Sequence, residues 1–379
     1  MAEKLQECFL NFCLKFPLDA QPDERACYTI KKGRKVEVMK TRWKVTGAGV
    51  LACLIAALVW WGISGQDKPP GKLIEEELVL PEIEGEYELL FLTDSHVVVE
   101  SGSGAERGSS ATGSGNAAEG VSVAEGGNEA RFAELSRKRY PQFADEEGRH
   151  SRENFEDWIE YANESEADGV LLGGDIIDSP SKEHMNFLKE SLKNLKMPYV
   201  YTLGNHDWTT PWDYMSANDR QSYLPGFLAF MQDDTAIHSH DFGEFIVVAV
   251  DNSTGQVDGN AIEPYQKILE QDKPVIVLVH VPFLTQSVLT KAKQVWNSGV
   301  VIGGGNYGGL YPNENSKRFM ELTTAKDSPV VAVLAGHVHF YDKDYIDGEK
   351  DVLQIVGDAG FHDSAVSLTI KGAESVQDE

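Results

Sequence analysis

The chain has 379 residues, enough for two or three domains, and its 41% hydrophobic and 25% charged residues are ordinary for a globular protein. This composition excludes a wholly disordered chain, a collagen-like chain and a multi-span membrane protein. The formal net charge is -26, and residues 1–66 carry 10 basic and 6 acidic residues, so the other 313 carry a net charge of -30. A body that acidic repels a phosphate backbone, and we expect no nucleic-acid partner.

The N-terminal part has the pattern of a membrane anchor. Residues 45–64 contain no charged side chain, and at 1.5 Å per residue they span about 30 Å, the thickness of a bilayer core. Residues 31–44 hold seven basic residues and one acidic residue. The positive-inside rule therefore predicts a short basic cytoplasmic segment over residues 1–44, a transmembrane signal anchor over 45–64, and a catalytic domain outside the cytoplasm.

A second interpretation of this region stays open. Translation from Met39 followed by cleavage after the apolar run would give a secreted protein. All four cysteines precede residue 54, so the exported part has no thiolate ligand and no disulfide. A large exported domain without cysteine is ordinary for a bacterial cell surface, and we expect a bacterial, single-pass membrane protein.

The rest of the chain alternates between strand and helix patterns. Residues 65–84 predict a stalk, because Pro69, Pro70 and Gly71 break the preceding helix. Residues 101–130 are rich in Gly, Ser, Ala and Glu and predict a low-complexity insertion in a domain over 85–379. We expect an α/β domain with buried strands. Its predicted strands are 86–93, 169–172, 199–203, 245–250, 275–279, 330–334, 352–356 and 365–370, and its predicted helices are 152–165, 181–195, 262–271 and 315–324.

Polar residues with metal-binding side chains follow five of the predicted strands. Because loops at the ends of buried strands are where α/β folds place their sites, we expect these residues to meet at one rim. Carboxylate, amide oxygen and imidazole are ligands for Mn²⁺, Fe or Zn²⁺ when no thiolate is present. So many ligands suit two divalent ions about 3.5–4 Å apart, which would polarise a phosphoryl group and generate hydroxide near neutral pH. The residues are Asp94, His96, Asp175, Asp178, Asn205, His206, His280, His337 and His339.

Their order resembles that of a known family. The motifs are Asp94-x-His96, Gly174-Asp175-x-x-Asp178, Gly204-Asn205-His206-Asp207, His280 and Gly336-His337-x-His339. This series is similar to the motif series of the calcineurin-like metallophosphoesterases, from about residue 86 to the end of the chain. The resemblance implies a four-layer α/β/β/α sandwich and a metal-dependent phosphoric ester hydrolase.

The resemblance also implies a role for each site residue. One metal ion would be held by Asp94, His96 and His339, and the other by Asn205, His280 and His337. Asp175 would bridge the two ions. His206 would protonate or stabilise the leaving oxygen, and Asp178 would orient its imidazole.

The predicted function is a dinuclear metal-dependent phosphoesterase that hydrolyses phosphodiesters or phosphomonoesters outside the cytoplasmic membrane. Its substrate would be a small-molecule or envelope phosphoester. The alternative is a non-catalytic metal-binding or scaffold protein of the cell surface that keeps the fold. His238 and His240 copy the spacing of a ligand pair but match no motif, and we expect them at the surface. Residues 303–309 either line the substrate pocket or form a long turn. The metal, the preferred ester and the oligomeric state stay open.

Overall fold

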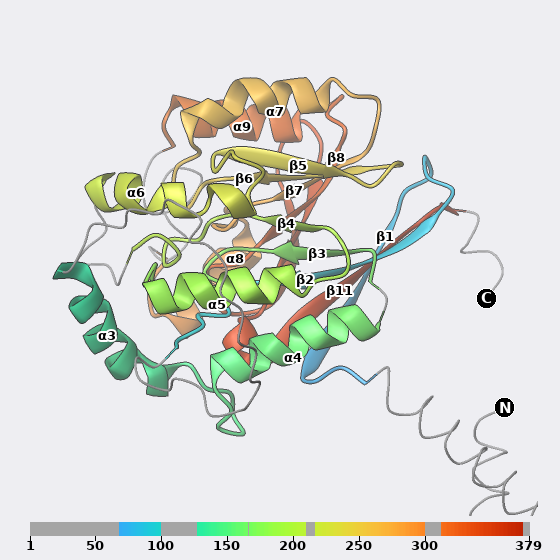
Figure 1. Ribbon diagram of the computed structural model, residues 1–379. Coiled ribbons are helices and arrows are strands. Elements are labelled where there is room, and N and C mark those ends of the chain that lie inside the picture. Colours follow the sequence, from blue (N-terminus) through green and yellow to red (C-terminus); the bar gives the residue numbers. More distant parts are fainter. Residues whose placement is uncertain (1–67, 100–126, 166, 210–216, 300–311, 374–379) are drawn as a thin grey trace, which may run out of the picture. The chain divides into compact units, whose positions relative to one another are not determined.

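The computed structural model describes residues 68–99, 127–165, 167–209, 217–299 and 312–373 (Figure 1). The predicted membrane span at 45–64, residues 303–309 and most of the predicted insertion at 101–130 lie outside these ranges. Within the described ranges, none of the helices combines the length and the apolar character needed to cross a bilayer.

Five strands form the first sheet, in the order β1-β11-β2-β3-β4. β2, β3 and β4 run parallel, β11 is antiparallel to β2, and β1 is parallel to β11. All four residues of β3 are buried, as expected for a strand covered on both faces. The bounds are β1 (Lys72–Val79), β2 (Glu86–Leu92), β3 (Gly169–Leu172), β4 (Tyr199–Tyr201) and β11 (Ser364–Lys371).

Six strands form the second sheet, in the order β5-β6-β7-β8-β10-β9. Its four central strands are parallel, and an antiparallel strand closes each edge. The parallel centre matters for function, because parallel strands deliver their carboxyl ends to the same edge of the sheet. The bounds are β5 (Ile237–Asp241), β6 (Ile246–Val250), β7 (Val275–Leu278), β8 (Val330–Ala335), β9 (Asp342–Ile346) and β10 (Val352–Val356).

The two sheets pack face to face, and helices cover their outer faces (Figure 1). Along β2, Leu89 and Phe91 enter the core between the sheets, while Leu90 and Leu92 pack under the helices on the other face. This alternation follows from the two-residue repeat of a strand. The mixed α/β architecture with four layers is the expected one. The helices are α3 (Gly127–Arg139), α4 (Ser151–Glu164), α5 (Lys182–Lys193), α6 (Ala217–Tyr223), α7 (Ile262–Leu269), α8 (Gln286–Val295) and α9 (Glu314–Thr324).

The predicted stalk at 65–84 is wrong for its second half, because residues 72–79 form β1 and pair with β11 along their whole length. Leu78 faces the core between the sheets, while Glu77 lies 2.9 Å from Lys371 and Glu76 pairs with Lys343. Charged side chains at a sheet edge are typical of a strand that must avoid further pairing. The folded domain therefore begins before residue 85.

The other predicted strands and helices lie within a few residues of observed ones, but several elements were not predicted. α3 begins at Gly127, inside the predicted insertion. β5, β9, α6 and α8 were missed because polar residues interrupt their apolar patterns. His238 lies buried in β5, where its Nε2 accepts the backbone N–H of Tyr201 at 3.4 Å, so it is not the surface residue that we expected.

Candidate metal centre

The loops that follow β2, β3, β4, β7 and β8 bring together all nine predicted site residues. Five of these residues have backbones in the left-handed region, with φ between 43° and 73°. A residue other than glycine held there costs about 1–3 kcal/mol, so the strain is concentrated where the side chains have to converge. The five are Asp94, His96, Asp175, His337 and His339.

Glycines allow the loops to approach one another. A Cβ atom on Gly336 would lie 1.9 Å from Oγ1 of Thr93 and 2.3 Å from Oδ2 of Asp94. A Cβ atom on Gly174, whose φ is +86°, would lie 2.6 Å from Nδ1 of His280. Both glycines therefore stand where any side chain would push the site residues apart.

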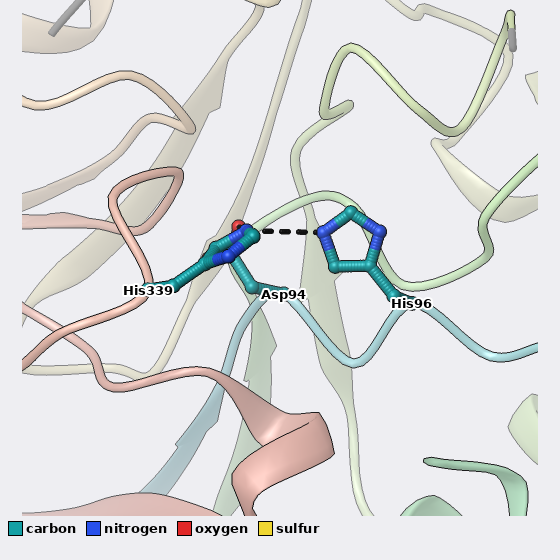
Figure 2. A group of neighbouring side chains, drawn as sticks. All are labelled: Asp94, His96 and His339. Atoms are coloured by element: carbon teal, nitrogen blue, oxygen red, sulfur yellow. Dashed lines mark hydrogen bonds and ion pairs between the residues drawn. The ribbon is translucent and has the colours of Figure 1, made fainter. Parts of the chain in front are cut away.

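The first cluster contains Asp94, His96 and His339 (Figure 2). Nε2 of His96 lies 3.1 Å from Nε2 of His339, which lies 3.3 Å from Oδ1 of Asp94. The other oxygen of Asp94 accepts the Thr93 hydroxyl at 2.6 Å and the His337 backbone N–H at 2.7 Å. The carboxylate is therefore fixed from behind, and its Oδ1 points toward the two imidazoles.

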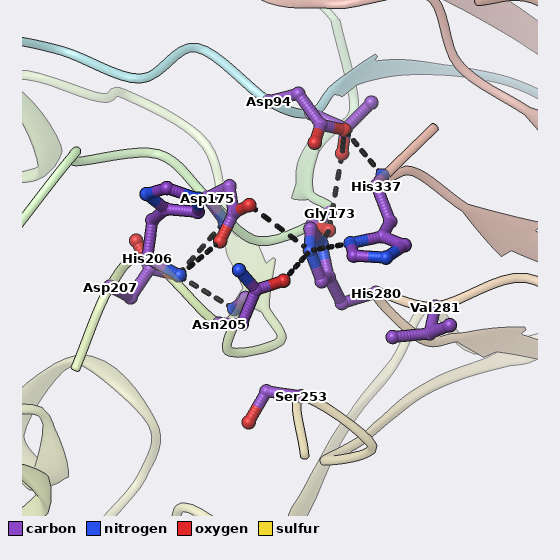
Figure 3. A network of polar contacts seen from close by, with 12 residues as sticks. Asp94, Gly173, Asp175, Asn205, His206, Asp207, Ser253, His280, Val281 and His337 are labelled. Atoms are coloured by element: carbon purple, nitrogen blue, oxygen red, sulfur yellow. Dashed lines mark hydrogen bonds and ion pairs between the residues drawn. The ribbon is translucent and has the colours of Figure 1, made fainter. Parts of the chain in front are cut away.

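The second cluster contains Asp175, His280 and His337, with Asn205 beside them (Figure 3). Nε2 of His280 is at its centre, 3.3 Å from Oδ2 of Asp175, 3.3 Å from Oδ1 of Asn205 and 3.2 Å from Nδ1 of His337. On its other side, Nδ1 of His280 lies 2.8 Å from the carbonyl oxygen of Gly173. That carbonyl can only accept, so Nδ1 carries the proton in the neutral ring and Nε2 faces the cluster with a lone pair.

Asp175 joins the two clusters. Its Oδ2 lies 3.6 Å from Nε2 of His96 and 3.3 Å from Nε2 of His280. Its Oδ1 accepts the backbone N–H of His206 at 2.6 Å. One oxygen of this carboxylate is thus held by the backbone, and the other is directed between the two sets of ligand atoms.

Asp178 and His206 form a polar pair beside the clusters. Nδ1 of His206 and Nδ1 of His96 each lie 3.1 Å from Oδ1 of Asp178. Arg139, at the end of α3, donates from its second terminal nitrogen to the same oxygen at 2.8 Å and from Nε to Oδ2. Asp178 is therefore a carboxylate held by one guanidinium, and its Oδ1 faces two imidazoles.

The pKa values of the imidazoles reflect this concentration of buried charge. Burial lowers the pKa of His96 to about 4, although Asp178 acts in the opposite direction. Burial and the neighbouring His280 lower the pKa of His337 to about 3. Burial would also lower the pKa of His280, but Asp175 outweighs it and raises the value to about 10. The carboxylates thus favour positive charge at the centre of the second cluster.

The pKa values of the carboxyl groups are likewise set by burial and by the charges of neighbouring side chains. Burial would raise the pKa of Asp94, but His339 and His280 lower it to about 2. Burial would likewise raise the pKa of Asp175, but His280 and His206 hold it well below its usual value. Both carboxyl groups are therefore ionised at neutral pH in a region closed to water.

These residues fit divalent cations. In the part of the chain that the structure describes, buried Oδ1 of Asp94 accepts no hydrogen bond. Nε2 of His96 faces Nε2 of His339 at hydrogen-bond distance, although Nδ1 of His96 is already directed at Asp178. Carboxylate oxygen and imidazole nitrogen atoms that converge in this way are the donor set of Mn²⁺, Fe and Zn²⁺ sites.

Two supporting residues near the ligands have roles that the sequence analysis did not assign. Asp207 is fully buried, and its carboxylate accepts the backbone N–H groups of Gly204 at 2.7 Å, Asp175 at 3.0 Å and Ile177 at 3.1 Å. Burial and the neighbouring Asp175 raise its pKa to about 7. It therefore fixes the loops after β3 and β4 to each other.

Asn252 fixes the backbone of the loop after β7 in a similar way. Its Oδ1 accepts the backbone N–H of His280 at 3.0 Å and that of Val281 at 2.9 Å, and its Nδ2 donates to the carbonyl of Val281 at 2.7 Å. Its position directly after β6 follows the same strand-end rule that identified the ligands. This strand-end position is the sequence feature from which the role of Asn252 could have been predicted.

An α/β/β/α protein with carboxylates and imidazoles converging at its strand ends, beside a His–Asp pair, has the features of a metal-binding hydrolase. A model of the calcineurin-like phosphoesterase family matches residues 87–341, and the chain belongs to this family. Membership in this family supports a hydrolase and favours it over the non-catalytic alternative.

Individual relatives are distant. A probable cyclic nucleotide phosphodiesterase from Xenorhabdus bovienii (strain SS-2004) is 25% identical over 88 residues, which are 21% of this chain and 36% of that protein. The matched region is thus little more than a third of the relative's length. A dimetal phosphatase from Danio rerio aligns with 73% of this chain and 88% of its own, at 9% identity and a TM-score of 0.41. A purple acid phosphatase from yellow lupin (Lupinus luteus) seeds aligns with 75% of this chain and 45% of its own, at 14% identity and a TM-score of 0.45.

Replacing Asn252 should weaken metal binding without removing a ligand. Asn252→Ala leaves two buried backbone N–H groups without their acceptor, and His280 loses its fixed position. We expect the affinity for the more weakly held metal ion to fall about 10- to 100-fold, measured by calorimetric titration of metal-free protein. The control is Asn260→Ala, at an exposed position of the same loop region. Equal affinities for a folded Asn252→Ala protein and the control would contradict this role.

Proposed function

We propose that this protein is a phosphoester hydrolase that works with two divalent metal ions on phosphate diesters or monoesters. The observation that carries the proposal is Oδ2 of Asp175, which faces Nε2 of His96 and Nε2 of His280 at 3.6 Å and 3.3 Å. One carboxylate oxygen shared by two sets of ligand atoms is what a bridge between two cations requires. The name of the bacterial relative, a probable cyclic nucleotide phosphodiesterase, favours diesters as the first class to test.

Each ion would have its own ligands in addition to Asp175. Asp94, His96 and His339 would hold one ion. His280 and His337, with the amide oxygen of Asn205, would hold the other. When bound, the ions would polarise the phosphoryl group and lower the pKa of water, and Mn²⁺, Fe or Zn²⁺ could serve.

The proton for the leaving group would come from His206. Burial would lower the pKa of His206, but Asp175 and Asp178 outweigh it and raise the value, which favours the protonated imidazole. Nδ1 lies beside Asp178, so Nε2 is the nitrogen available to donate a proton to the departing ester oxygen. Arg139 keeps Asp178 in place and ionised, and thereby fixes the direction of the ring.

The location of the enzyme is a separate part of the proposal. The uncharged run at 45–64 and the basic residues before it support a single-pass anchor with the N-terminus in the cytoplasm. The phosphoesterase domain would then act outside the membrane of a bacterium, on a small-molecule or envelope phosphoester. A net charge of -30 over residues 67–379 repels a phosphate backbone and argues against nucleic acid as the substrate.

Replacing the shared carboxylate should abolish hydrolysis. We expect Asp175→Asn to lower kcat/KM more than about 100-fold in the full-length protein, because both sets of ligand atoms lose their common charge. The assay compares a chromogenic phosphodiester with its monoester, after metal removal by a chelator and return of Mn²⁺, Fe²⁺ or Zn²⁺. Asp327→Asn, at an exposed position, is the matched control. Activity that survives both the chelator and Asp175→Asn would refute the two-metal mechanism.

Replacing His206 should affect substrates according to their leaving group. An alkoxide needs a proton as it departs, whereas nitrophenolate is stable without one. We therefore expect His206→Gln to lower kcat about 10²- to 10⁴-fold for an alkyl ester and much less for a nitrophenyl ester. His240→Gln, which changes a histidine in β5 outside the three ligand clusters, should leave both rates unchanged. Equal losses for the two esters would mean that His206 is not the proton donor.

The membrane orientation can be tested by labelling cysteines in intact bacterial cells. One variant keeps only Cys8, and another carries Asp327→Cys as its single cysteine. An impermeant maleimide should label position 327 directly and Cys8 only after the membrane is opened. Loss of Cys8 from the mature chain would indicate the secreted form instead. Protection of position 327 in intact cells would contradict an external catalytic domain.

A further inference from the structure

Trp296 is a large, partly exposed aromatic side chain beside the candidate metal centre. It follows the last residue of α8 and is 41% exposed. Its ring centroid lies 5.3 Å from that of His339, with the two planes inclined by 69°. An indole therefore stands directly beside one of the candidate metal ligands.

The indole is held in a fixed orientation. Its Nε1–H donates to the carbonyl oxygen of Val338 at 2.9 Å, and Val338 is the residue between His337 and His339. The single polar atom of the side chain is thus satisfied by the loop that carries two ligands. What remains exposed is the carbon surface of the rings.

The indole lies beside one of the places where the candidate metal centre reaches solvent. The side chains of Asp94 and His280 are completely buried, whereas those of His339 and His206 are 17% and 12% exposed. The centre is therefore closed around Asp94 and His280 and reaches solvent near His339 and His206, and His337 is likewise only half-buried. A phosphoester bound there would have one of its substituents within reach of the ring beside His339.

We propose that Trp296 forms a stacking subsite for a planar aromatic group of the substrate, and that this group is a nucleobase. The inference rests on the proposed phosphoesterase function and adds a substrate class to it. A nucleobase has a flat, uncharged face that suits an exposed indole, and base–aromatic stacking tolerates different bases. An uncharged base also avoids the repulsion that the acidic domain exerts on anions.

Two variants of Trp296 distinguish the contribution of its aromatic ring from that of its hydrogen bond to Val338. Trp296→Phe keeps a ring and loses the N–H donor, and Trp296→Gln keeps an N–H donor and loses the ring. The substrates are adenosine 5′-(methyl phosphate) and ribose 5-(methyl phosphate), with the two corresponding monoesters, so each pair differs only in the base. The quantity compared is the ratio of kcat/KM for the two members of a pair, because any general disturbance of the loop cancels in this ratio.

We expect the full-length wild-type protein to prefer the adenosine ester by about 10-fold. Trp296→Gln should lower this preference at least about fivefold, through KM rather than kcat, and Trp296→Phe should largely retain it. Tyr345→Gln, which removes an exposed aromatic ring from β9, should leave the ratio unchanged. No preference in the wild type, or an equal loss in Trp296→Phe and Trp296→Gln, would overturn the subsite.

The proposed function can fail independently of this inference. If the wild-type protein hydrolyses both members of a pair equally, the phosphoesterase proposal stands and the stacking subsite is wrong. If it hydrolyses none of the four esters, calorimetric binding of adenosine monophosphate and of ribose 5-phosphate replaces the rates. Tighter binding of the adenosine compound that Trp296→Gln abolishes would still support the subsite, and equal binding would refute it.

Discussion

Two ionised carboxylates, Asp94 and Asp175, lie in the closed interior of this protein, and their charge has to be compensated. Burial alone would raise both pKa values, yet the surrounding imidazoles keep both groups ionised. The same carboxylate, Asp175, raises the pKa of His280 to about 10. An arrangement that draws positive charge to one buried point is the electrostatic signature of a cation site, and divalent ions would supply that charge more fully than protons can.

The fold supplies the rigidity that this arrangement needs. Parallel strands in both sheets end at the same rim, and five residues in the left-handed backbone region turn their side chains inward. Such strain persists only where the surroundings enforce it. Asp207 does so through a hydrogen bond to the backbone of Asp175, and Asn252 separately fixes the backbone of His280. The candidate ligands are thus positioned by buried polar residues outside the ligand clusters.

The sequence predicted which polar residues converge and most of the strands, because both depend on local pattern. An apolar run followed by Asp, Asn or His identifies a strand and its site residue together. The remaining features depend on distant contacts: β1 pairs with β11 almost 300 residues later in the chain. Arg139 reaches Asp178 from 39 residues away, and Trp296 reaches Val338 across 42 residues. A strand with three successive glutamates looks like a linker until the partners of those charges are known.

The central claim is that Asp175 lies between two metal ions. It is tested most directly by loading the metal-free full-length protein with Mn²⁺, counting the bound ions and recording their electron paramagnetic resonance spectrum. The account predicts about two Mn²⁺ per chain, with the multiline spectrum of an exchange-coupled pair, because ions in such sites lie about 3.5–4 Å apart. A single Mn²⁺ per chain, or two ions with the spectrum of isolated Mn²⁺, would contradict it.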